Sequence, residues 1–276
     1  MKTQNVSRAV FVIIASLILF LPPSLSAQSI WVNQGQGKVI AIEFLKPNFD
    51  GEDNSTFATS AIFLSGRFPI SSEMIFVAEL PFSHIGSKDF DESESSIGNP
   101  YIGVEIRKEG KPFFTELGLR PPLAPDDKDG AQSVGVVTDF DRAEAFGNKV
   151  FTITGKGNYY RKAASNMVVR LRVGPTLFLD TGNGNFVGET ELLLDYNAQV
   201  GYEGAQISLL GGFTGRLVVT QEDSDFGERT IHQLGAAASL NLGTVRPGIH
   251  VRLPLDNDLK DTIDFVYGLN LGIHLE

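Results

Sequence analysis

The strongest constraint on this chain is a two-residue alternation of apolar and polar side chains. Residues 263–275 read IDFVYGLNLGIHL, with isoleucine, phenylalanine, tyrosine and leucine at every second position. Residues 189–203 and 244–255 repeat the pattern. Because successive side chains of a β-strand point to opposite faces, this alternation predicts strands with one apolar and one polar face.

The rest of the chain divides in the same way into segments separated by turn residues. Several segments reach ten residues or more, and a tilted strand needs about nine to eleven residues to cross a bilayer. The predicted strands cover residues 38–45, 57–68, 74–83, 99–108, 112–120, 150–161, 167–179, 189–203, 205–219, 230–242, 244–255 and 263–275.

The connections between these strands indicate which face points outward. Long and short connections alternate throughout, as they do in outer-membrane barrels. A barrel of about twelve strands is also too wide for side chains alone to fill. A soluble β-sandwich or a lipocalin-like barrel, with its apolar face inward, is the alternative. We predict an all-β fold: a single antiparallel transmembrane β-barrel of about twelve strands over residues 28–276.

The first residues have the layout of an export signal. Lys2 and Arg8 precede an apolar core, Ala9–Leu21, which is shorter than the ~20 residues of a transmembrane helix. Small residues around Ala27 suit a cleavage site. We expect residues 1–27 to be a Sec-type signal peptide and the mature protein to reside in the cell outer membrane. The net charge of −10 argues against nucleic acid as a partner.

The polar face of the predicted barrel would line its lumen. The two signs of charge are mixed on this face, so we expect most side chains to pair across the lumen and leave a narrow path for permeation. The predicted lumen-lining residues are Glu43, Arg67, Glu79, Glu105, Arg107, Glu116, Arg120, Lys156, Arg170, Arg172, Glu191, Asp195, Arg216, Arg246, Arg252 and Asp264.

The alternation stops once, at Ala131–Phe146, where apolar residues recur at spacings of three and four. This spacing predicts a short helix of about three to four turns in an extracellular loop. The helix has three candidate positions: the barrel mouth, the barrel interior, or neighbouring loops only. We expect it to narrow or gate the pore. The constriction would be formed by Val134, Val137, Phe140 and Arg142, with Arg142 three residues from Asp139.

Residues typical of enzymes are sparse. The four histidines form no HExxH pair, no GxSxG sequence is present, and no His-x-Ser of the kind found in outer-membrane phospholipases occurs. We expect neither catalysis nor a cofactor nor a metal site. Trp31 precedes the first strand, and we expect it to anchor the barrel at the periplasmic interface.

A family resemblance rests on Ser95–Pro125, SSIGNPYIGVEIRKEGKPFFTELGLRPPLAP, and on the TDFDRAEAF segment that follows. The chain resembles the bacterial outer-membrane transporters of the meta-pathway phenol-degradation family, which are taken to be hydrophobic-substrate channels. The resemblance implies passive uptake of small molecules, including hydrophobic or aromatic ones. The alternative is a non-conducting structural or adhesive barrel that acts through its acidic external loops. The expected partners are outer-membrane lipid and lipopolysaccharide, the barrel-assembly machinery and a small-molecule solute.

Overall fold

The computed structural model describes residues 30–31, 37–51, 55–87, 93–182, 190–221 and 225–276. The expected signal peptide and its cleavage site lie outside these residues. The strands are β1 (Lys38–Phe49), β2 (Ser60–Pro69), β3 (Met74–Gly86), β4 (Ser93–Ile97), β5 (Tyr101–Arg107), β6 (Phe113–Arg120), β7 (Val150–Lys162), β8 (Met167–Asp180), β9 (Glu191–Glu203), β10 (Ile207–Val218), β11 (Thr230–Leu240), β12 (Val245–Pro254) and β13 (Ile263–Leu275).

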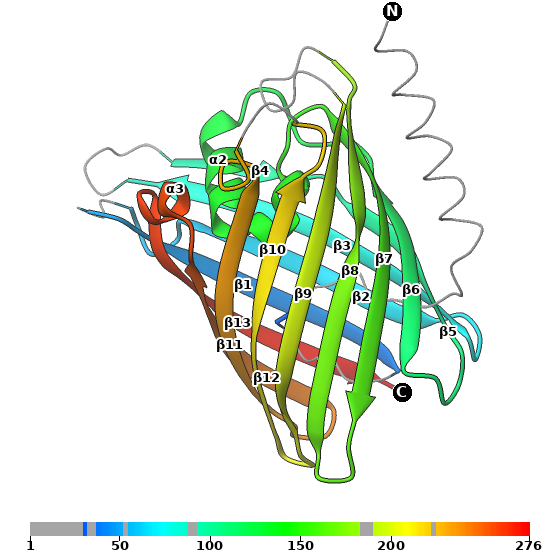
Figure 1. Ribbon diagram of the computed structural model, residues 1–276. Coiled ribbons are helices and arrows are strands. Elements are labelled where there is room, and N and C mark those ends of the chain that lie inside the picture. Colours follow the sequence, from blue (N-terminus) through cyan, green and yellow to red (C-terminus); the bar gives the residue numbers. More distant parts are fainter. Residues whose placement is uncertain (1–29, 32–36, 52–54, 88–92, 183–189, 222–224) are drawn as a thin grey trace, which may run out of the picture.

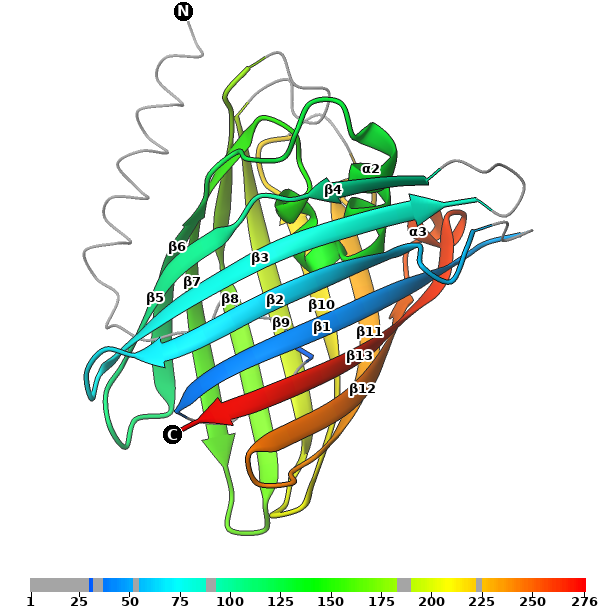
Figure 2. The same cartoon turned by 180° about the vertical axis from the view of Figure 1, so that it is seen from behind.

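The strands form one closed antiparallel barrel (Figures 1 and 2). Each strand from β5 to β13 pairs with its sequence neighbour, β13 pairs with β1, and β3 joins β2 to β5. Twelve strands make the wall, which confirms the predicted fold. β4 is additional and was not predicted. In the described part of the chain it pairs with the last residues of β3, Phe82–Gly86. β5 pairs with the earlier residues of β3, Met74–Glu79.

The predicted alternation of connections is also observed. Short turns join β2 to β3, β5 to β6, β7 to β8, β9 to β10 and β11 to β12, and they gather at one end of the barrel (Figure 1). We call this the short-turn end. The other connections lie at the opposite, long-loop end, which carries β4, α2 (Asp129–Thr138), the 3-10 helix η1 (Phe140–Ala145) and α3 (Asn257–Lys260).

The two faces of the wall differ sharply in polarity. Ile42 and Leu269 are 46% and 50% exposed, whereas the adjacent Glu43 and Asn270 are 4% and 8% exposed. The same contrast between leucine, isoleucine or valine outside and polar residues inside recurs around the barrel. A soluble protein rarely exposes so continuous an apolar surface. The apolar face therefore points outward, as the connection lengths predicted, and suits contact with lipid.

The break in the alternation forms two short helices instead of one. α2 ends at Thr138, and Asp139 has the non-helical angles φ −136° and ψ 83° before η1 begins. Gly135 permits close packing here, because a Cβ at this position would lie 2.3 Å from the Phe146 ring. None of the helices in the described parts of the chain has the length and apolar character needed to cross a membrane.

An apolar cluster fills the inside of the barrel at the long-loop end. It contains Leu45, Ala61, Phe63, Ala145, Phe146, Ile263 and Val266. The register between β1 and β13 shifts here, so that Asn48 pairs with Phe265 and Phe49 pairs with Ile263. This irregularity turns Ile263 inward. Asp264 is exposed and accepts a hydrogen bond from the Asn48 amide at 2.9 Å, so the prediction that it lines the lumen was wrong.

Candidate pore constriction

Residues 129–145, comprising α2 and η1, fold into the barrel, and we call them the inward segment (Figure 1). Val134 is 4% exposed, and Val136 and Val137 pack against the apolar cluster on the inner wall. The side chains of these valines therefore attach the segment to the wall. The helix lies in two of the three positions considered: α2 begins at the barrel mouth, where the Ala131 N–H donates to Glu94 on β4, and the segment then reaches the interior through Val136, Val137 and η1.

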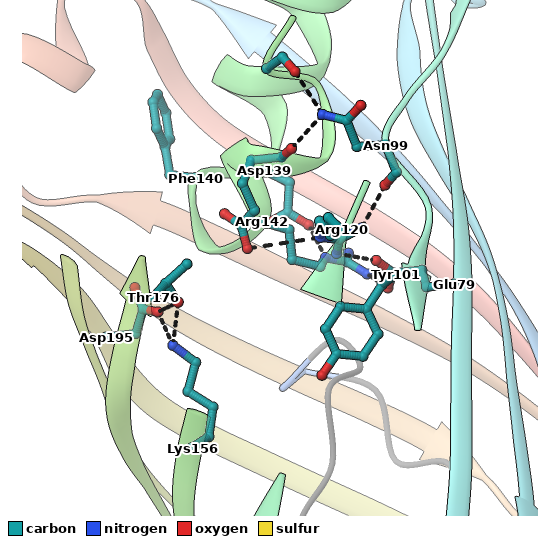
Figure 3. Close-up of polar contacts among 12 residues, drawn as sticks. Glu79, Asn99, Tyr101, Arg120, Asp139, Phe140, Arg142, Lys156, Thr176 and Asp195 are labelled. Carbon is teal, nitrogen blue, oxygen red and sulfur yellow. Dashed lines mark hydrogen bonds and ion pairs between the residues drawn. The ribbon is translucent and has the colours of Figure 1, made fainter. Parts of the chain in front are cut away.

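Arg142 connects the inward segment to two strands of the wall (Figure 3). Its Nη2 lies 2.5 Å from Glu43 Oε2 on β1, and its Nη1 lies 2.6 Å from Glu79 Oε2 on β3. The third carboxylate is that of Asp139, 2.5 Å from Nη2. The guanidinium also stacks 3.5 Å from the centre of the Phe63 ring, a favourable cation–π position. We call Arg142 and these three carboxylates the Arg142 hub.

Arginines from the wall hold the inward segment at further points. Arg252 Nη1 on β12 lies 2.7 Å from Asp139 Oδ1 in the segment. Arg120 on β6 lies 4.0 Å from Glu144 Oε1 through its Nε, and its Nη2 pairs with Glu79 Oε1 on the wall strand β3 at 2.5 Å. Arg216 on β10 contacts the segment through Glu144 Oε2 at 2.9 Å and donates to the Phe140 carbonyl at 2.8 Å. Phe140 thus contributes its backbone to these contacts, and its side chain points away from the hub (Figure 3).

Ion pairs continue along the inner wall. Lys156 and Arg216 share the carboxylate of Asp195, Arg67 and Arg107 share Glu105, and Arg172 lies 3.8 Å from Glu116, which also accepts a hydrogen bond from Tyr101. An arginine or lysine lies within 4.0 Å of every carboxylate in the following group: Glu43, Glu79, Glu105, Glu116, Asp139, Asp141, Glu144 and Asp195. The structure therefore brings most of the predicted lumen-lining residues together as pairs.

The remaining predicted residues lie apart from this network. Arg170 pairs with Glu203 at 2.5 Å towards the short-turn end. Glu191 accepts a hydrogen bond from Gln221 at the long-loop end, in an exposed position. Arg246 is half-buried near the start of β12.

The two aspartates of the inward segment, Asp139 and Asp141, have pKa values shifted in opposite directions. Burial alone would raise the pKa of Asp139, but Arg142 and Arg252 outweigh it and hold the pKa well below its usual range. Burial, reinforced by the nearby charge of Asp139, raises the pKa of Asp141. The same carboxylates outweigh burial at Arg142 and raise the pKa of its guanidinium. The segment thus contains one firmly ionised carboxylate beside one that is costly to ionise.

Asn99 was missed by the sequence analysis although it lies in the stretch that carried the family resemblance. Its Nδ2 donates to the carbonyls of Glu144 at 3.1 Å and Gly147 at 2.6 Å, and its Oδ1 accepts from the backbone of Leu123 and Ala124. A Cβ on the preceding Gly98 would lie 2.2 Å from the Ala145 carbonyl oxygen. Asn99 of the IGNP sequence therefore binds the β6–β7 connection on both sides of α2: at Leu123 and Ala124 before it, and at Glu144 and Gly147 after it.

Trp31 lies inside the lumen, so the expected interfacial anchor was wrong. Its side chain is 1% exposed, and its Nε1–H donates to Asp141 Oδ2 at 3.2 Å. Ile30 and Trp31 line a cavity of about 60 Å³ together with residues of the inward segment and of the inner wall. The position of Trp31 depends on its contact with Asp141, which is 110 residues away in sequence. The alternation of apolar and polar residues along a strand cannot indicate such a contact.

Two histidines make cross-strand contacts that a search along single strands does not find. His84 Nδ1 lies 2.8 Å from Ser95 Oγ, which pairs with it across β3 and β4. His232 lies between Asp256 and the Tyr196 hydroxyl, with ring nitrogens 3.1 and 2.7 Å from these partners. Both sets are at the long-loop end, away from the Arg142 hub.

Comparison with known proteins gives matches among solved structures only. No protein-family model and no curated protein matches the sequence. An outer membrane channel from Pseudomonas putida F1 superposes with a TM-score of 0.62 at 12% identity, over 90% of this chain and 99% of that chain. The NanC porin gives 0.50 at 7% identity, over 87% of this chain and 100% of that chain. The translocator domain of the autotransporter NalP from Neisseria meningitidis gives 0.52 at 9% identity, over 89% and 91%.

Identities this low establish the fold alone. The chain has the closed β-barrel fold of outer-membrane proteins. The resemblance to outer-membrane channels, which the sequence indicated, is confirmed at the level of the fold by the channel from Pseudomonas putida F1 and by the NanC porin.

Proposed function

We propose that this protein is an outer-membrane channel for the passive uptake of small molecules through the barrel lumen. One observation carries the proposal: the closed wall has leucine, isoleucine and valine outside and paired charges inside. An apolar outer face is stable in lipid, and a polar interior admits water and solutes. The names of two structural neighbours, a channel and a porin, support the same class of function.

The inward segment would form the constriction of this channel. It is attached at the Arg142 hub and at Asn99, and it occupies the lumen between β1–β3 and β10. Because the carboxylates around it are neutralised by arginine or lysine, no ring of one sign is left to select ions. We therefore expect weak selectivity between cations and anions, with size as the main restriction.

The solutes would include hydrophobic or aromatic molecules. The family resemblance supports this class. Three buried aromatic rings on the inner wall, Phe63, Phe178 and Tyr101, provide apolar surface between the ion pairs, and Phe146, directly after η1, adds a fourth. The location would be the cell outer membrane, reached by Sec-type export and cleavage near Ala27. Lipid and lipopolysaccharide would surround the barrel, and the barrel-assembly machinery would insert it.

The test compares conductance in planar bilayers before and after removal of residues 134–144, which include Val134, Val137, Phe140 and Arg142. Removal should raise single-channel conductance, because the constriction is lost. Glu43 and Glu79 are changed to glutamine in the same variant, since the deletion removes the Arg142 guanidinium that both buried carboxylates contact. The double glutamine variant without the deletion is the control. Unchanged conductance in a deletion variant that keeps its heat-dependent migration on gels would contradict a gating role.

A non-conducting barrel is the second candidate, and the small cavity beside the Arg142 hub favours it. The cavity beside the Arg142 hub measures only about 60 Å³, room for a few water molecules. In that case the acidic loops at the long-loop end would act by adhesion or by a structural role. Absence of ion steps and of solute uptake into liposomes, in both the whole chain and the deletion variant, would support this candidate over the channel.

A further inference from the structure

Four basic side chains are exposed on two neighbouring turns at the short-turn end. Lys108 and Lys111 belong to the β5–β6 turn, and Arg161 and Lys162 end β7 where the β7–β8 turn begins. The two turns are neighbours in the wall because β6 pairs with β7. Between them they carry one acidic residue, Glu109. We call the four basic residues the basic edge.

The charges of the basic edge differ from those of the lumen in being open to an external partner. Among the described residues, none of its four side chains takes part in an ion pair or donates a side-chain hydrogen bond. Arg107 and Arg170, which lie close to the same turns, are instead paired with Glu105 and Glu203 on the inner wall. The barrel therefore neutralises its inward arginines and leaves the basic edge charged.

An aromatic pair on the outer face marks the membrane boundary beside the basic edge. Phe113 on β6 and Tyr159 on β7 are register partners, and their ring centres lie 4.9 Å apart. Phe113 is 63% exposed, and Tyr159 shares the outward face of β7 with Ile153, which is 47% exposed. Aromatic side chains favour the interface between headgroups and acyl chains. Arg161 follows Tyr159 by two residues and Lys111 precedes Phe113 by two, so these bases lie at the level of the headgroups.

The two ends of the barrel carry opposite charge. At the long-loop end, the described exposed residues include six aspartates from three connections: Asp126, Asp127, Asp129, Asp225, Asp258 and Asp261. These carboxylates repel an anionic headgroup, whereas each lysine or arginine at a membrane surface strengthens the attraction to anionic lipid. Charge complementarity thus selects one class of lipid and one end of the barrel.

We propose that the basic edge is a binding site for the headgroup of an anionic phospholipid. The phosphate lies between the β5–β6 and β7–β8 turns, and the acyl chains lie on the outward face of β6 and β7 beyond Phe113 and Tyr159. The site holds the short-turn end in the leaflet that contains such lipids. The inference goes beyond the proposed channel, because a non-conducting barrel in the same membrane has the same site.

The test compares phosphatidylglycerol with phosphatidylcholine of the same acyl chains, so that the two lipids differ in the charge of the headgroup. The purified protein in a non-ionic detergent is mixed with each lipid, and native mass spectrometry counts the lipid molecules bound. Wild type should bind phosphatidylglycerol at least about tenfold more tightly. Arg161→Gln alone should reduce this preference by roughly fivefold, and changing all four residues of the basic edge to glutamine should abolish it.

The matched control removes the same number of positive charges at the long-loop end, where Lys128, Lys149, Arg229 and Lys260 are changed to glutamine. The two quadruple variants have the same net charge, so a difference between them reports the place of the charges and not their sum. The control should keep the wild-type preference. Heat-dependent migration on gels shows that each barrel is folded.

Equal affinity of wild type for the two lipids would overturn the proposal. An equal loss of preference in the two quadruple variants would show attraction by overall charge and would overturn it as well. Displacement of bound phosphatidylglycerol by an equal concentration of inorganic phosphate would assign the basic edge to soluble phosphate and overturn the assignment to lipid. Conductance enters none of these measurements, so they decide the lipid site whether or not the channel proposal holds.

Discussion

Two parts of the chain occupy the lumen, and they are held there in different ways. The inward segment is fastened by buried ion pairs to β1, β3, β10 and β12. Among the described residues, Ile30 and Trp31 make two hydrogen bonds, and the indole ring packs against Gly235. Removing one partner of a buried ion pair costs about 3–5 kcal/mol, whereas a neutral hydrogen bond contributes about 1 kcal/mol. The comparison indicates that charge holds the inward segment, whereas hydrogen bonding and the shape of one ring hold Trp31.

The largest effect should follow from breaking the Arg142 hub. Arg142→Met leaves the carboxylates of Glu43, Glu79 and Asp139 buried with less of their compensating charge. The free energy of opening of the inward segment should fall by about 3–5 kcal/mol. Hydrogen exchange measured by mass spectrometry over residues 129–145 reports this loss.

The control for this variant is Arg170→Met. Arg170 pairs with Glu203 near the short-turn end, and its side chain is 20% exposed. Loss of this more accessible pair should cost at most about 1 kcal/mol and leave exchange of the inward segment unchanged. Equal protection in Arg142→Met and wild type would mean that packing of the valines, and not the hub, holds the segment.

A smaller effect should follow from Asn99→Ala. The substitution removes the partners of four backbone groups around the inward segment, at Leu123, Ala124, Glu144 and Gly147. Because water can enter and satisfy some of them, we expect a loss of about 2–3 kcal/mol in the opening free energy of this region. The control is Asn241→Ala, which removes two side-chain hydrogen bonds to the backbone in an exposed turn. This variant should leave the exchange rates of residues 129–145 unchanged. Similar rates in both variants would contradict a clamping role for Asn99.

The smallest effect should be a pH dependence. The folded-state pKa of Asp139 is depressed, so its ionised form stabilises the inward segment above the ordinary value of 3.8, and this contribution is lost as pH falls through the folded-state pKa. Asp141 has the opposite sign, because its raised pKa makes ionisation costly as pH rises above 3.8. Protection of residues 129–145 should therefore respond to Asp139→Asn above about pH 4 and converge with wild type in stronger acid. A constant difference at every pH would show that the charge of Asp139 is not responsible.

The barrel could be predicted because each strand has to satisfy two environments at once. Lipid outside and ion pairs inside force the alternation that is visible in residues 263–275, and connection lengths then decide which face is outside. β4 has no such double requirement, because it pairs only with the end of β3 and its SESSI sequence lies in an acidic connection. A shift of one residue in register at Asn48 and Phe49 was enough to reverse the expected orientation of Asp264.

The candidate constriction was predicted in outline only. The helical spacing located the inward segment, and Asp139 and Arg142 are indeed three residues apart and paired. The other partners of Arg142, Glu43 and Glu79, and the other partner of Asp139, Arg252, come from distant strands. No local sequence pattern specifies which of these charges will meet. Trp31 has even less signal, since a single aromatic residue before a strand suits the membrane interface as well as the lumen.

The Arg142 hub and its neighbour Arg252 lie on the two sides of the junction where β1 pairs with β13. Glu43 belongs to β1, Arg252 belongs to β12, and β13 lies between them in the wall. Pairing of β1 with β13 joins residues more than two hundred positions apart, such as Lys38 and Leu275, and contacts of such separation form slowly. The ion pairs of Arg142 with Glu43 and of Arg252 with Asp139 therefore face each other across a junction that closes only when the last strand has been added. During biogenesis, unpaired charges would mark an unfinished barrel, and their neutralisation would coincide with closure.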